Sequence, residues 1–390
     1  VLLALLLGLA GTLWQADRAR AERDRARLEA AKAGETARFL ASLFQNADPS
    51  RSRGEQLTVR ELLDRGAARV DAELATQPVL QATMLTLIGA AYRDLGALDP
   101  ARAALERAVE LASSSAESES LEHAAALTEL AGLERMAGNL DLARRAGERG
   151  LALRERLLGG DDLDIARTLA VLALVDRLEG KPEAAREELE RALAIAGQKG
   201  VESGEIGRWI NNLGLVASDV GHLAEAELHF RKALAVIERS EGRESALVAL
   251  ALDNLGAALR AQEKRDEALP VLERALSVVE RSWGVAHFQY GTALNSLGSL
   301  LLETRRFEEA RERFAAAAAV YREALGPGSP YLVWPVTNQG LALLELGRPR
   351  EALAFFRQAL ALRRELYGEE HGQVASSHSD VGLALVALDD

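Results

Sequence analysis

Small residues recur along this chain in a register of about 42 residues, and that register restricts the chain to a repeating fold. The clearest copy spans residues 211–239, where apolar residues follow helical spacing on both sides of Gly221. Because glycine commonly ends a helix, this copy predicts two helices joined by a turn. The position of Gly214 in the first helix is small in every copy. Its equivalents are Gly89, Ala131, Ala173, Gly214, Gly256, Gly298, Gly340 and Gly382, at steps of 42, 42, 41, 42, 42, 42 and 42.

A second column of small residues lies twelve positions after the first. Two antiparallel helices approach closely only where neither carries a large side chain at the contact. We therefore expect Gly214 and Ala226 to mark a helix crossing, and we expect loose packing where Gly147 and Gly150 replace larger residues. The second column holds Ala101, Ala143, Ala185, Ala226, Ala268, Ala310 and Ala352.

The repeat resembles the tetratricopeptide repeat in its 42-residue, kinesin-light-chain-like form. The connectors SWGVAHFQYGTALNSLG, from Ser282, and LYGEEHGQVASSHSDVG, from Leu366, are similar to that family's Leu-Gly-x-x-His-Pro segment. The resemblance implies an all-α fold, an α-solenoid in which antiparallel helix pairs form a right-handed superhelix. It implies seven full repeats over residues 81–390 and the first helix of an eighth, after which we expect the natural chain to continue. The turn residues Glu263 and Arg305 replace the family's glycine and leave the turn geometry there open.

The composition suits long helices and excludes several kinds of site. Aromatic residues make up 4% of the 390 residues, and there is no cysteine, which excludes disulfides and thiolate metal sites. The net charge is −12, with the excess of acidic residues concentrated after residue 60. An acidic array argues against binding to a phosphate backbone, so nucleic acid is not an expected partner.

The first 16 residues predict a truncated membrane-spanning helix. Val1 to Trp14 carries no charge but is shorter than the roughly 20 residues that cross a bilayer. Because the chain begins with valine, we expect upstream residues to complete the span; a buried helix or a signal-peptide core is the alternative. Residues 17–80 predict a juxtamembrane stalk and capping helices. Thr58 and Glu61 have capping-box spacing before a helix that reaches about Leu74.

The N-terminal region has a resemblance of its own. An apolar span, an Arg/Glu/Ala stalk, RFLASLFQNADPSR and LTVRELLDRGAARVDAEL resemble the region that follows the kinase domain in bacterial membrane-anchored serine/threonine protein kinases. This resemblance implies anchoring in a bacterial inner membrane with the repeats extracytoplasmic. The arginine-rich flank from Arg18 to Arg27 instead places this side in the cytoplasm by the positive-inside rule. The membrane orientation therefore stays open.

The sequence indicates a chain without catalytic residues. Kinase motifs, a Gly-x-Ser-x-Gly elbow and the His-Glu-x-x-His spacing of a zinc site are all missing. His287 and His371, two periods apart in the connectors, are expected to cap helices rather than to catalyse. We predict no enzyme activity in this chain, no cofactor and no metal site; the parent protein could still be a serine/threonine kinase.

One polar column is the candidate binding site. Short polar side chains stand two residues before the small residue of the first helix, although asparagine disfavours helix interiors. The resemblance implies that such side chains hold the backbone of an extended peptide, and a carboxamide both donates and accepts hydrogen bonds. Alternatively, these side chains bond to one another or to the adjacent repeat. The column holds Asn212, Asn254, Ser296, Asn338 and Asp380; further groove candidates are Asn211, Asn295, Trp209 and Trp334, of which each tryptophan could instead pack between helices.

Two hypotheses for the function follow. The chain is a non-catalytic scaffold, tethered to a membrane, that binds a protein or an extended peptide in a concave groove. Alternatively, it is the sensory or scaffolding region of a bacterial serine/threonine kinase whose catalytic domain lies upstream. Neither hypothesis calls for a nucleic acid or a small-molecule substrate.

Overall fold

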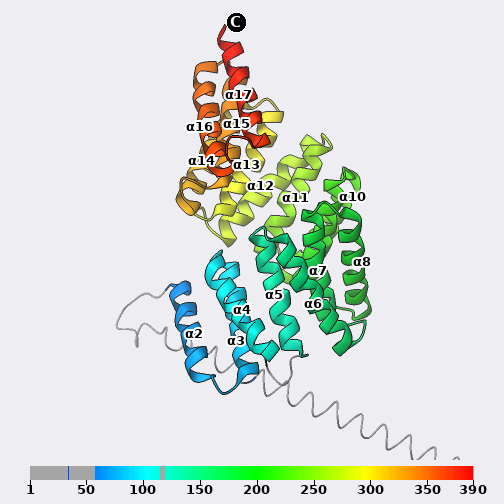
Figure 1. The fold of residues 1–390 in the computed structure, drawn as a ribbon. Helices are drawn as coiled ribbons and strands as arrows, with labels where there is room; N and C mark the ends of the chain where they lie inside the picture. Colours follow the sequence, from blue (N-terminus) through cyan, green and yellow to red (C-terminus); the bar gives the residue numbers. More distant parts are fainter. Residues whose placement is uncertain (1–33, 35–57, 115–118, 390) are drawn as a thin grey trace, which may run out of the picture. The chain divides into compact units, whose positions relative to one another are not determined.

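The computed structural model describes Gly34 and residues 58–114 and 119–389 (Figure 1). These residues form 16 α-helices and one short 3₁₀ helix, and no strand occurs among them. The chain divides into two compact units, residues 1–179 and 180–390. The all-α prediction is confirmed for the described part of the chain.

The first unit contains six described helices that pack as antiparallel neighbours. It begins with a capping box, as predicted: the Thr58 hydroxyl accepts a hydrogen bond from the Glu61 N–H, and the Glu61 carboxylate accepts one from the Thr58 N–H at 2.8 Å. Leu63 of this helix packs on the core of the unit, so the helix covers the first helix pair. The helices are α2 (Val59–Glu73), α3 (Pro78–Asp94), α4 (Leu98–Ser114), α5 (Leu121–Met136), α6 (Leu140–Leu158) and α7 (Leu163–Leu178).

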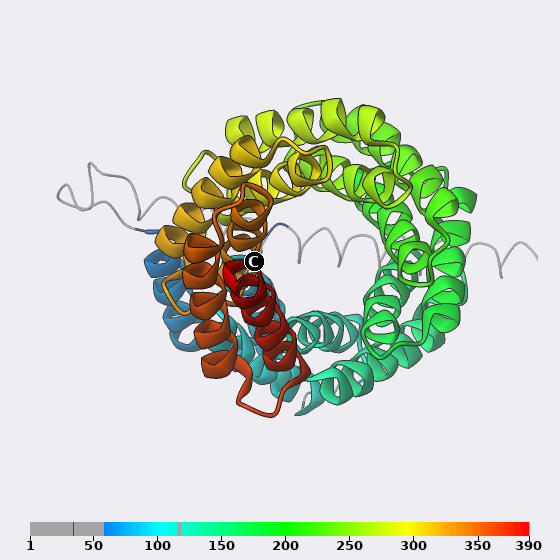
Figure 2. The same cartoon turned by 90° about the horizontal axis from the view of Figure 1, so that it is seen from above.

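The second unit carries the most regular copies of the repeat. Its first helices, α9, α11, α13 and α15, form an inner layer in which successive members contact one another, and the second helices lie outside them (Figure 2). The helices are α8 (Pro182–Gln198), α9 (Gly204–Asp219), α10 (Leu223–Glu241), α11 (Ala246–Ala261), α12 (Arg265–Ser282), α13 (Phe288–Glu303), α14 (Phe307–Leu325), η1 (Pro330–Leu332), α15 (Val333–Glu345), α16 (Pro349–Tyr367) and α17 (Gly372–Asp389).

Five of the six glycines in the first column, all except Gly382, accommodate a large side chain from the second helix of their own pair. A β-carbon built on Gly214 would lie 2.5 Å from a ring carbon of Phe230, four residues beyond Ala226. Close approach therefore depends on a glycine facing a large apolar side chain of the second helix, a contact that the column of small residues did not itself predict. Ala226 is fully buried beside this contact. Equivalent pairs are Gly89 with Leu105, Gly256 with Leu272, Gly298 with Phe314 and Gly340 with Phe356.

The second repeat packs tightly, contrary to expectation. A β-carbon on Gly147 would lie 2.7 Å from the Leu172 side chain and 3.6 Å from Ala131. One on Gly150 would lie 3.1 Å from the Thr128 hydroxyl. The neighbouring side chains fill the volume that the missing groups would occupy, so the small residues bring α6 closer instead of loosening it.

The turn between the two helices of a pair keeps its geometry where glycine is absent. Glu263 and Arg305 adopt φ values of 61° and 63°, close to the 80° of Gly221 at the equivalent position. A side chain in this left-handed region is strained by roughly 1 kcal/mol or more. The repeat thus imposes the turn on both residues.

First helices begin at a capping residue that also recurs in register. The His287 and His371 rings accept hydrogen bonds from the backbone N–H groups of Gln289 and Gln373, at 3.3 and 3.2 Å. This confirms that the two histidines cap helices. The capping column consists of Ser120, Asp162, Ser203, Ser245, His287, Ser329 and His371, and each side chain accepts a bond from the start of its helix.

The predicted membrane span over residues 1–16 lies outside the described residues, as do residues 17–33 and 35–57 of the stalk. Among the helices that the structure does describe, none combines the length and the apolar character needed to cross a bilayer.

Candidate functional site

The polar column of the second unit forms hydrogen-bonded links between successive first helices. The Asn254 side chain on α11 donates from Nδ2 to Oδ1 of Asn211 on α9 at 3.0 Å. Both side chains are half-buried. A residue of the column is thus linked to the residue one position earlier in the preceding repeat, 43 residues away.

Two more links of this kind follow along the inner layer. Asn338 on α15 lies 3.5 Å from Asn295 on α13, again Nδ2 to Oδ1, and Ser296 hydrogen-bonds to Asp253 between α13 and α11. We call Asn211, Asp253, Asn254, Asn295, Ser296 and Asn338 the polar row.

The two ends of the predicted column do not continue the row. Asn212 is half-buried on α9. Asp380 on α17 forms an ion pair with the buried Arg363, Oδ2 to Nη1 at 3.5 Å. Thr337, which stands where a link to Asp380 would begin, donates its hydroxyl to the Val333 carbonyl at 2.9 Å instead. The row therefore runs from α9 to α15.

The two tryptophans have different environments. Trp209 is only 4% exposed and packs within the second unit, as in the packing alternative. Trp334 is 57% exposed and stands one helical turn before Asn338 on α15. At the same position in α11, one turn before Asn254, Leu250 is 37% exposed. Residues four apart share a helix face, so apolar side chains flank the polar row at two repeats.

Asp253 is the only acidic member of the row, and sequence reasoning missed it. Its Oδ1 atom is buried and has no hydrogen-bond partner within the described part of the chain. Burial raises the pKa of the Asp253 carboxyl to about 6, against the opposing effects of its bond from Ser296 and of the Arg260 charge. The signal was available, since Asp253 occupies the position that Asn211 and Asn295 occupy in their own repeats.

A family model decides what kind of array this is. The model for the tetratricopeptide repeat matches residues 80–156, 122–198, 205–281, 289–365 and 336–390. The chain belongs to the tetratricopeptide repeat family. Its described helices form a tetratricopeptide repeat solenoid, a fold that serves protein binding and is typically non-catalytic. No curated protein matches the chain.

Solved structures agree with this assignment. BtubC (BKLC) from P. vanneervenii is 21% identical, with a TM-score of 0.52 over 60% of this chain and 94% of that protein. The Rap protein complexed with Competence and Sporulation Factor is 15% identical, with a TM-score of 0.56 over 91% of this chain and 99% of its own. A putative kinesin light chain from Podosopora anserina is 19% identical, with a TM-score of 0.43 over 51% of this chain and 95% of its own. The first two similarities show a shared fold.

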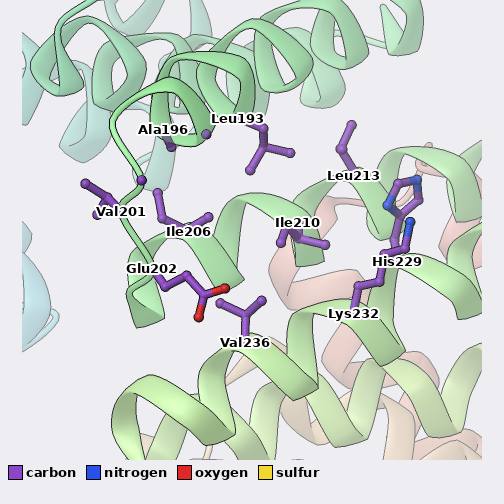
Figure 3. A pocket seen from close by; sticks show the side chains of 12 residues that line it. Leu193, Ala196, Val201, Glu202, Ile206, Ile210, Leu213, His229, Lys232 and Val236 are labelled. Atoms are coloured by element: carbon purple, nitrogen blue, oxygen red, sulfur yellow. The ribbon is translucent and has the colours of Figure 1, made fainter.

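A second candidate site is a cavity of about 620 Å³ between α8, α9 and α10 (Figure 3). α8 is two residues shorter than α10 and the connector after it is one residue longer, which accounts for the step of 41. Most residues that line the cavity are aliphatic. The cavity has two charged lining residues, Glu202 and Lys232. Glu202 pairs with Arg239 at 3.2 Å, and the lining residue His229 lies 3.6 Å from Glu225. Polar groups do not converge here as they do in the polar row.

The described residues include no group of three or more histidine, aspartate or glutamate side chains placed to hold a metal ion. Most carboxylates lie at the surface, but Glu134 and Asp176 of the first unit are buried. They form ion pairs with Arg102 and Arg144 respectively. The buried carboxylates therefore link successive tetratricopeptide repeats.

Proposed function

We propose that this chain is a non-catalytic scaffold that binds an extended peptide, or an extended segment of a protein, along the polar row. The observation that carries the proposal is the series of half-buried links between Asn211 and Asn254, between Asp253 and Ser296, and between Asn295 and Asn338. Each link presents short polar side chains at the inner layer at intervals of one repeat.

The asparagines retain hydrogen-bonding capacity beyond the links. A carboxamide carries two N–H donors and an oxygen with two lone pairs. The link between α11 and α9 uses one donor of Asn254 and one lone pair of Asn211. A peptide group offers one donor and one acceptor per residue, which matches the remaining capacity. Each link fixes the orientation of an amide. Bonding between neighbouring repeats is therefore compatible with peptide binding by the same side chains.

Apolar side chains beside the row support binding rather than a purely internal role. Trp334 is 57% exposed one turn from Asn338, and an exposed tryptophan offers a large contact area. A neighbour in fold, the Rap protein, is complexed with Competence and Sporulation Factor. A binding role agrees with both observations.

The experiment selects ligands from a random 15-residue peptide library displayed on phage, with the full chain as bait. Selected peptides are then titrated against the wild type and against the double variant Asn254→Ala and Asn338→Ala. We expect each substitution to weaken binding about tenfold, because each removes roughly 1 kcal/mol or more of hydrogen bonding to the peptide backbone.

The matched control is Asn139→Ala, which removes a carboxamide at a turn of the first unit, where Asn139 donates to Glu134. It should leave the affinity unchanged. If the double variant binds like the wild type, or if no peptide is selected, the row is not the binding surface. Helix content measured by circular dichroism separates a loss of contact from a loss of fold.

We also propose that the scaffold is tethered to a bacterial inner membrane through residues 1–16, with the repeats on the extracytoplasmic side. The uncharged stretch from Val1 to Trp14 and the charged stalk behind it support the tether. The resemblance of the N-terminal region supports a serine/threonine kinase as the parent protein. Sequencing the reading frame upstream of Val1 tests the proposed kinase parent: a kinase domain there supports it, and an unrelated domain contradicts it.

A further inference from the structure

The central link of the polar row differs from its neighbours in charge. Asn211 and Asn295 are neutral, whereas Asp253, the equivalent residue between them, is an acid. Ser296 donates its one hydroxyl proton to the Asp253 carboxylate, and Oδ1 of that carboxylate is buried with no hydrogen-bond partner among the residues that the structure describes. A carboxylate oxygen without a donor is costly in a protein interior.

Nearby donors bond to groups other than the Asp253 carboxylate. Arg260, two turns along α11, donates to Glu303 on α13 through both Nε, at 3.3 Å, and Nη2. Tyr321 on α14 donates its hydroxyl to Thr292 at 3.0 Å. Asn254, adjacent in sequence, donates to Asn211. The free protein therefore places a poorly compensated acidic group in the middle of its binding row.

We propose that Asp253 makes the central repeat selective for a basic side chain, lysine or arginine, in the bound peptide. This inference rests on the proposed function of the row. Asp253 is partly exposed as a residue although its Oδ1 atom is buried, so a cation that lies along the row would approach the carboxylate at the edge of the buried group. An ammonium or guanidinium group supplies both the charge and the N–H donors that the site lacks.

The arrangement of the row also fixes where the basic residue binds. Asparagines at the flanking links bind peptide backbone irrespective of side chain, whereas Asp253 adds a charge at one repeat only. Selected peptides should therefore carry lysine or arginine at one fixed position. Net attraction by an acidic surface would instead enrich basic residues throughout the peptide.

The test repeats the phage selection with the isosteric variant Asp253→Asn. A selected peptide and its analogue with norleucine in place of the basic residue are then titrated against both proteins. The wild type should prefer the basic peptide by about tenfold or more, and Asp253→Asn should bind the two equally. The wild-type preference should shrink as the pH falls below about 6, while that of the variant stays flat.

A second variant moves the acid along the row. In the Asp253→Asn background, Asn295→Asp should restore selection for a basic residue at a shifted position in the peptide. If peptides bind but neither protein prefers a basic residue, the inference about Asp253 is wrong and the proposed function survives. If no peptide binds at all, the proposed function and this inference both fail.

Discussion

Gly298 on α13 faces Phe314 on α14 so closely that a β-carbon on the glycine would lie 2.8 Å from the phenylalanine ring. Ordinary contacts to a β-carbon are longer than this, so only glycine permits the observed distance between the two helices. The same relationship holds between Gly340 and Phe356 in the next pair. The 42-residue register of small residues therefore marks the positions that large side chains of the second helices contact.

Replacing Gly298 by leucine should destabilise the second unit by about 1 to 3 kcal/mol or more, because the new side chain overpacks against Phe314. The matched control is Gly382→Leu. Gly382 occupies the same column of the repeat on α17, but a β-carbon built on it would meet no atom of a neighbouring described residue within 4 Å. Denaturant unfolding that shows equal losses in both variants would contradict the packing account.

Substitution by glycine should stabilise the two strained turns. Glu263→Gly and Arg305→Gly should each raise the free energy of unfolding by roughly 0.5 to 1 kcal/mol, because glycine relieves the positive φ angles at these residues. The reverse change, Gly221→Glu, should lower it by a similar amount. Thermal unfolding that ranks the variants in the opposite order would show that the turn is not strained.

The capping column predicts a second stability effect. Ser245→Ala should cost about 1 kcal/mol, because the hydroxyl accepts a hydrogen bond from the Leu247 N–H at 3.2 Å. Ser245→Asp should be nearly neutral, since aspartate caps equally well and Asp162 holds the same position in another repeat. If both substitutions cost the same, the capping bond is not what stabilises this helix start.

The pH dependence of stability should show two opposing contributions. Burial raises the pKa of Asp253 from 3.8 to about 6, so the folded state favours the protonated acid and loses stability as the pH rises from about 4 to 6. Hydrogen bonding from Arg186 lowers the pKa of Glu225 to about 2, so its contribution is present above pH 4.5 and is lost toward pH 2.

Urea unfolding at several pH values separates these contributions. Asp253→Asn should be more stable than the wild type at pH 7, by up to about 2 to 3 kcal/mol, and should lose this advantage near pH 4. Glu225→Gln should be less stable than the wild type at pH 7, with a difference that narrows toward pH 2. An Asp253→Asn difference that is constant with pH would contradict the raised pKa.

Much of the fold could be predicted from the register alone. Helix pairs, the capping role of His287 and the capping box at Thr58 follow from local sequence, because spacing and side-chain chemistry determine them. The contact of Gly214 with Phe230 could not be predicted, since it depends on how two helices rotate about their axes. The same limit applied to Gly147, whose missing side chain is replaced by Leu172 from the next repeat.

The candidate site divides in the same way. The register identified Asn254 and Asn338, yet the link from Asn254 to Asn211 depends on the offset between adjacent helices, which sequence periodicity does not contain. Exposure also came only from the structure, which buries Trp209 and exposes Trp334. The position of Asp253 in the register is visible in the sequence, but the burial of its Oδ1 without a donor among the described residues depends on the folded structure.

The most direct test of the account is photo-crosslinking from matched positions on the two layers of the second unit. Ala257 is exposed on the first helix α11, one turn from Asn254, and Ala235 is exposed on the second helix α10. Each of the two residues is replaced by benzoylphenylalanine. Peptides selected on the full chain should crosslink to position 257 and not to position 235. Crosslinking at 235 with none at 257 would contradict the claim that the polar row is the binding surface.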